Sequence, residues 1–151
     1  MKSESKPQSC TNLKLRQITR RVTQHYDAEL LKTGLKTTQY SLLSYVVKLG
    51  PIRAVDLAVA MRMSTSTLSR NLQPLIANGW IEVNSGQDAR SRLISVTDTG
   101  RSKRSEAQRK WRIAQEGINA RLGMERVLAL HDLIDESLEL LSSLEADDDD
   151  L

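Results

Sequence analysis

The feature that most constrains the fold is a pair of short runs rich in β-branched residues, 80–83 and 92–96, placed among segments of helical periodicity. A polar, glycine-containing loop separates the two runs, which predicts a β-hairpin with a long tip. Apolar residues recur at steps of three and four elsewhere, which predicts helices over 11–32, 39–48, 55–61, 64–78, 98–121 and 124–145. The fold class is therefore mainly α, with four helices, a hairpin and two further helices.

Composition limits the possible classes. At 151 residues the chain has the size of a single domain, expected to span 1–151, and its hydrophobic content of 39% is enough for one core. Aromatic residues make up only 3%, so we expect a core of Leu, Ile, Val and Ala. No apolar run reaches membrane-spanning length and residues 1–9 lack a signal-peptide core, which predicts a cytoplasmic protein with no membrane partner.

The charge is distributed unevenly along the chain. Residues 1–52 and 53–112 each carry a net charge of +6, whereas residues 122–151 carry −9 and end in an acidic tail, 146–151. A positive charge over the first three quarters favours a polyanionic partner, and double-stranded DNA is the leading candidate. A solvated surface without a partner is the alternative.

The helices at 55–61 and 64–78, joined at Arg62 and Met63, predict a helix-turn-helix whose second helix enters the major groove. Thr38 and Thr97 are expected helix N-caps, either Ser64 or Thr65 is the expected N-cap of the second helix of this motif, and Gly34 is an expected C-cap. No acidic residue lies between Asp56 and Glu82, so nothing on the second helix would repel phosphate. Its outward polar residues are the candidate DNA readers: Ser64, Thr65, Ser66, Thr67, Ser69, Arg70 and Gln73. An ordinary amphipathic surface helix is the alternative.

The hairpin tip carries Arg90 and Arg92 beside Asp88. A flexible loop ending in arginine can reach an adjacent minor groove, and Asp88 is placed to hold the guanidinium of Arg90. The alternative is a charged turn with a surface ion pair. A helix-turn-helix followed directly by a basic hairpin is a winged helix, so residues 38–97 are the predicted DNA-binding region.

These residues resemble the MarR family of bacterial transcription regulators. The resemblance rests on 63–70, on Leu75, on 78–81, on Asp88-Ala89-Arg90-Ser91-Arg92 and on Val96-Thr97-Asp98-Thr99-Gly100. The flanking helices extend it over nearly the whole chain. It implies a homodimeric winged helix, mostly a repressor, often released from DNA by a small phenolic ligand or by oxidation. It also assigns DNA contacts to the 64–73 face, to Arg90 and to its supporting Asp88.

The outer helices, 11–32 and 98–145, are predicted to form a dimerisation domain. The apolar stripe from Leu15 to Leu30 and the near-heptad seam from Val127 to Leu144 are poorly covered by so small a centre, and a second copy of the chain would bury them. Packing of the outer helices on each other within one chain is the alternative.

Two kinds of effector are considered. An aromatic acid would sit in a cleft lined by a set of six candidate residues, Arg16, Arg20, His25, Tyr26, Tyr40 and Tyr45, although packing at the edge of the core also explains the tyrosines. Cys10, at a helix N-terminus near Lys14, is the candidate for a redox switch. Family members that sense hydroperoxides would have their cysteine at Asn12 and a second tyrosine at Thr37, so release by a small organic ligand is favoured over oxidation.

The remaining function classes are excluded or kept as alternatives. The sequence offers no nucleophile–base pair, phosphate loop or metal cluster, and the single cysteine excludes a disulfide framework, so no enzyme, metal site or cofactor is predicted. A winged-helix module for protein contact or non-specific DNA binding remains the main alternative to a sequence-specific regulator.

Overall fold

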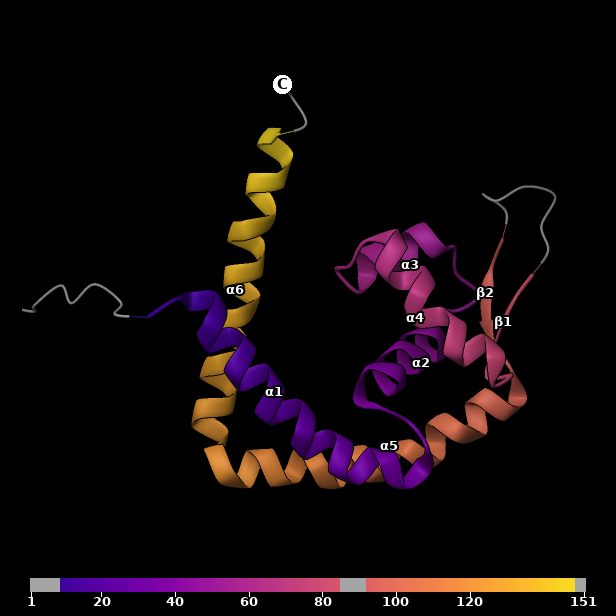
Figure 1. Cartoon of the computed structure of the whole chain (residues 1–151), viewed down its shortest axis with the longest axis horizontal. Coiled ribbons are helices and arrows are strands. Elements are labelled where there is room, and N and C mark those ends of the chain that lie inside the picture. Colours follow the sequence, from indigo (N-terminus) through magenta and orange to yellow (C-terminus); the bar gives the residue numbers. More distant parts are fainter. Residues whose placement is uncertain (1–8, 85–91, 149–151) are drawn as a thin grey trace, which may run out of the picture. The chain divides into compact units, whose positions relative to one another are not determined.

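The computed structural model describes residues 9–84 and 92–148 and divides into two compact units, Met1–Ala114 and Gln115–Leu151. The elements of the first unit are α1 (Thr11–Leu30), the 3-10 helix η1 (Leu31–Thr33), α2 (Thr37–Leu49), α3 (Ala54–Ala60), α4 (Thr65–Ala77), β1 (Ile81–Val83), β2 (Ile94–Val96) and most of α5 (Asp98–Leu122). The second unit holds the end of α5 and α6 (Met124–Asp148) (Figure 1). The predicted fold class, mainly α with a two-stranded hairpin after a helix-turn-helix, is confirmed.

The two strands form an antiparallel hairpin in which Ile81 pairs with Val96 and Val83 with Ile94. A third extended segment, which the sequence analysis missed, joins this hairpin at Ile52. Its amide donates to the carbonyl of Ile94 at 3.1 Å, and the amide of Ile94 donates back at 2.8 Å. The hairpin is thereby tied to the loop between α2 and α3, which fixes the base of the wing against the helix-turn-helix.

The core of the first unit is aliphatic, as the scarcity of aromatic residues predicts. The largest fully buried side chains are Leu30, Leu35, Leu42, Leu43, Val46, Leu57, Leu68, Leu75, Ile81 and Ile94. They come from α1, from the loop between η1 and α2, from α2, α3 and α4, and from both strands. Burial of these side chains holds α4 and the hairpin in one packed body, since each aliphatic side chain removed from water contributes roughly 1.5–3 kcal/mol.

Three of the predicted helix ends are confirmed, and one is wrong. Gly34 ends η1 with a left-handed φ of 86°, Ser64 caps α4, and Thr97 caps α5 by accepting the amide of Gly100 at 3.0 Å. Thr38, however, does not cap α2, because that helix begins at Thr37, two residues before its predicted start, and its N-cap is Lys36. The carboxylate of Asp27 accepts both the amide of Thr37 at 2.8 Å and its hydroxyl at 2.6 Å, so a side chain from α1 satisfies the start of α2.

Candidate nucleic-acid interface

The turn before α4 sets the direction in which that helix starts. Arg62 has a left-handed backbone with φ of 53°, and the amide of Met63 donates to the carbonyl of Ala58 at 3.0 Å. Ser64 then accepts the amide of Thr67 at 3.2 Å and donates its hydroxyl to Oγ1 of Thr67 at 3.0 Å. The side-chain cap leaves the other backbone amides of the first turn directed outward, an arrangement suited to phosphate.

The two faces of α4 differ in the way that a reading helix requires. Leu68, Leu72 and Leu75 are buried against the core. The predicted DNA readers lie on the other side, where Thr67 is half-buried and the rest are exposed: Ser64, Thr65, Ser66, Ser69, Arg70 and Gln73. The helix therefore presents a continuous polar face without a carboxylate.

Arg70 is the cation on this face. Its side chain is exposed and makes no hydrogen bond or ion pair with any residue that the structure describes. Asp56, the nearest acidic residue before α4 in the sequence, is instead paired with Arg53 at 2.9 Å. The guanidinium of Arg70 thus keeps all its donors for an external acceptor, such as the paired acceptors of guanine in the major groove.

The base of the wing is fixed by two backbone hydrogen bonds and one from a side chain. The amide of Thr97 donates to the carbonyl of Trp80 at 3.0 Å, its hydroxyl donates to the carbonyl of Gly79 at 2.6 Å, and Asn84 donates to Leu93 at 2.9 Å. Arg92 is exposed and lies just before β2. Asp88 and Arg90, the other predicted wing contacts, lie outside the described residues.

The six candidate effector-binding residues differ in their surroundings. Arg16 and Arg20 are exposed on α1, as is Tyr45 on α2. Nε2 of His25 lies 3.0 Å from the carbonyl oxygen of Ala114, and Tyr40 is buried and stacks on Trp111 with ring centroids 6.2 Å apart. The rings of the adjacent residues His25 and Tyr26 meet edge to face, with ring centroids 6.1 Å apart. Burial raises the pKa of the Tyr26 hydroxyl above its usual 10.0.

Cys10 is a free, exposed thiol immediately before α1. Its carbonyl accepts the amide of Lys14 at 3.1 Å, while its side chain makes no capping bond. Within residues 9–84 and 92–148, no group of three His, Cys, Asp or Glu side chains is placed to hold a metal ion. None of the described helices combines the length and the apolar character needed to cross a membrane.

Comparison with known proteins gives a consistent result. A model of the MarR family matches residues 33–91. The chain is 26% identical over 130 residues to an uncharacterised HTH-type transcriptional regulator, YwoH of Bacillus subtilis (strain 168), with 86% of this chain and 87% of that protein covered.

Two solved structures extend this likeness. The transcriptional regulator MosR of M. tuberculosis in complex with DNA is 29% identical with a TM-score of 0.71, and the match covers 86% of this chain and 98% of that one. NadR in complex with 4-hydroxyphenylacetate shares the fold, with a TM-score of 0.73, 19% identity and coverage of 89% and 99%. These relatives are regulators of transcription or share their fold, and none of them is described as an enzyme.

Proposed function

We propose that the chain is a member of the MarR family of DNA-binding transcription regulators, and that it is a homodimeric, sequence-specific repressor of a palindromic operator and not an enzyme. The observation that carries the proposal is the exposed, carboxylate-free face of α4, on which Arg70 has no partner among the described residues. Residues 38–97 bind DNA in the cytoplasm, with α4 in the major groove and Asp88, Arg90 and Arg92 at the minor groove. The acidic tail, 146–151, takes no part in contacting DNA.

The dimer forms through the helices at 11–32 and 98–145. Apolar side chains remain exposed along α1 and α6 of the single chain, including Leu15 (52%), Ile134 (41%) and Leu141 (60%). The first half of α1 is basic and the described part of α6 is mainly acidic, so the two surfaces are also complementary in charge. A two-fold dimer presents two copies of α4 about one helical turn of DNA apart, roughly 34 Å, which matches a palindrome.

The sharpest test of this proposal separates Arg70 from Arg90. A bidentate contact of Arg70 with guanine supplies about 1–3 kcal/mol of discrimination, so Arg70→Ala weakens binding to the operator far more than binding to random duplex. Arg90 acts mainly by charge, so Arg90→Ala weakens both and lowers the salt slope by roughly one counterion per wing. Asp88→Ala has the same effect as Arg90→Ala in a milder form, since the guanidinium keeps its charge.

Binding titrations on operator and random duplex at several salt concentrations measure these differences. Arg21→Ala, at an exposed arginine of α1, is the charge-matched control and leaves the preference for operator unchanged. If Arg70→Ala lowers the affinity for operator and for random duplex equally, Arg70 does not read a base. A wild-type protein that binds both duplexes equally at matched salt would instead favour non-specific DNA binding.

The effector that releases DNA is a small aromatic acid rather than an oxidant. NadR, which shares this fold, is known in complex with 4-hydroxyphenylacetate, and the effector-binding residues proposed here are Arg16, Arg20, His25, Tyr26, Tyr40 and Tyr45. We expect Cys10→Ser to respond to organic hydroperoxide as the wild type does, with neither protein released from operator DNA in a mobility-shift assay. Release of the wild type alone would make Cys10 the sensor and reverse this assignment.

A further inference from the structure

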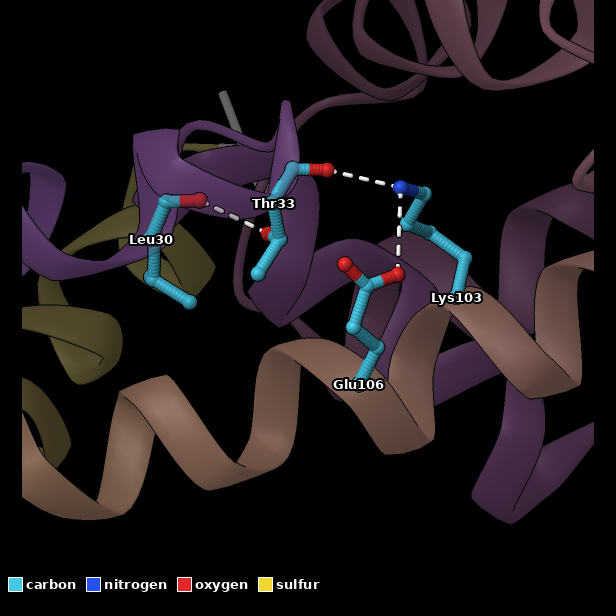
Figure 2. Close-up of polar contacts among 4 residues, drawn as sticks. All are labelled: Leu30, Thr33, Lys103 and Glu106. Carbon is cyan, nitrogen blue, oxygen red and sulfur yellow. Dashed lines mark hydrogen bonds and ion pairs between the residues drawn. The ribbon is translucent and has the colours of Figure 1, made fainter.

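Lys103, in the second turn of α5, holds together groups that are distant in the sequence. Its Nζ donates to the carbonyl of Thr33 at 2.7 Å and lies 3.3 Å from Oε2 of Glu106 (Figure 2). The same Nζ lies over the Trp80 ring, 5.6 Å from the ring centroid. The ammonium thus has two hydrogen-bond acceptors and a cation–π contact with the Trp80 ring. Only 23% of the Lys103 side chain is exposed, so most of the side chain contacts the protein and not solvent.

The first contact fixes the end of the N-terminal helical segment. Thr33 is buried, and its hydroxyl donates to the carbonyl of Leu30 at 2.7 Å. Thr33 is the last residue of η1, where backbone carbonyls lack helical partners and carry partial negative charge. Lys103 therefore satisfies an acceptor that the helix itself leaves open.

The Trp80 contact lies at the junction of α4 and the wing. The amide of Trp80 donates to the carbonyl of Leu75 in α4 at 3.0 Å, and the carbonyl of Trp80 accepts the amide of Thr97. α5 packs so closely here that a Cβ on Gly100 would collide with the Trp80 carbonyl. The position of Trp80 is thus directly linked to the end of α4 and to the start of β1.

We propose that Lys103 is a positioning residue for DNA binding: it couples the end of the N-terminal helical segment at Thr33 to the junction of α4 and the wing at Trp80. If Thr33 or Trp80 shifts, the Lys103 ammonium can no longer contact both residues. The Lys103 contacts therefore favour one arrangement of α4 and the wing. Lys103 thereby sets operator affinity without contacting DNA itself. This inference rests on the proposed function of α4 and the wing.

Salt dependence distinguishes positioning from direct contact. A lysine that neutralises a phosphate contributes about one unit to the slope of log affinity against log salt, whereas a residue that only positions others contributes none. We expect Lys103→Met, which keeps the apolar stem and loses the ammonium, to weaken operator binding by about 5- to 30-fold, within the usual range of coupling between sites, with the slope unchanged.

Five further variants, one of them a double substitution, complete the experiment. Lys103→Arg restores affinity, because a guanidinium also donates several hydrogen bonds and stacks on aromatic rings. Trp80→Leu weakens binding in the same direction without a change of charge, and its combination with Lys103→Met is less than additive. Lys110→Met, at a lysine of α5 with no polar partner among the described residues, is near wild type. Glu106→Gln, which removes the carboxylate charge but keeps an amide oxygen that can accept from Lys103, is also near wild type.

A spectroscopic measurement separates positioning from loss of folding. The chain has two tryptophans, so Trp111→Phe leaves Trp80 as the only one. In that background Lys103→Met changes the Trp80 emission of the folded, DNA-free protein, and Lys110→Met does not. A titration at stoichiometric DNA concentration gives the fraction of each protein that can bind DNA. Dissociation constants are calculated from that active concentration, so that partial unfolding is not counted as weaker binding.

Three results would overturn the inference: wild-type affinity for Lys103→Met, a salt slope lowered by about one, or independent effects of Lys103→Met and Trp80→Leu. If Lys103→Met binds with wild-type affinity but Arg70→Ala loses the preference for operator, the proposed function stands and only the role of Lys103 is wrong. A wild-type protein without operator preference would instead contradict the proposed function.

Discussion

Tyr26 is the described residue whose burial most clearly changes its ionisation. The hydroxyl lies on the inner side of α1, and desolvation raises its pKa above the 10.0 of an exposed tyrosine. In the unfolded chain the group ionises near its ordinary value, so above about pH 10 the unfolded state loses a proton that the folded state keeps. The contribution of Tyr26 to stability is present below that pH and is lost as the pH rises.

We therefore expect Tyr26→Phe to reduce the alkaline loss of stability. Urea unfolding of the wild type and the variant between pH 8 and about pH 11 measures the difference in slope. Tyr45→Phe, at an exposed tyrosine of α2, is the control and keeps the wild-type profile. An alkaline slope that is the same in all three proteins would mean that Tyr26 ionises equally in the folded and unfolded states.

The elements that local chemistry specifies are the ones that the sequence predicts well. Ser64 and Thr97 cap α4 and α5 through bonds within a few residues, and these helix starts follow directly from residue type. The start of α2 depends instead on Asp27, ten residues earlier, and Ile52 joins the hairpin across more than forty residues. Neither bond leaves a periodic signal in the sequence, although a β-branched Ile52 after Pro51 is consistent with an extended segment.

The same distinction applies to the candidate site. The polar face of α4 is predictable, because a helical period separates Leu68, Leu72 and Leu75 from the polar residues between them. Lys103 is not, because it contacts Thr33 and Trp80 through the tertiary fold, and its neighbours on α5 include several other basic residues with the same local appearance. The periodicity of the sequence is therefore enough to predict the polar face of α4. The residue that positions this face, Lys103, is found only from contacts in the folded structure.

A prediction for α4 follows from its cap. Ser64→Ala removes the acceptor of the Thr67 amide, and loss of an N-cap of this kind costs about 1 kcal/mol of the free energy of unfolding. Ser69→Ala, an exposed site inside the same helix, is the matched control and is neutral or slightly stabilising, because alanine has the higher helix propensity. Urea denaturation compares the two, and equal stabilities would show that the Ser64 hydroxyl contributes nothing to the cap.

At the scale of the whole molecule, the distribution of exposed apolar residues requires an explanation. In the first unit the winged-helix residues bury an aliphatic core, yet Leu15 and Ile18 remain exposed on α1. In the second unit Val127 is buried, whereas Ile134 and Leu141 farther along α6 are exposed. Repeated exposure at near-heptad spacing is costly in water and is typical of a helix that packs against another copy.

We expect the double substitution Ile134→Glu and Leu141→Glu to give a monomer, because two buried carboxylates without partners would oppose association of the seam. A monomer presents a single α4, so operator affinity falls by a factor of roughly 10² to 10⁴ as the second half-site contact is lost. Ala129→Glu adds a carboxylate to a different face of α6 and leaves the dimer intact. Sedimentation equilibrium and operator titration measure both properties on the same samples. A double variant that stays dimeric would place the seam against its own chain, and a monomer that keeps full operator affinity would show that one half-site suffices.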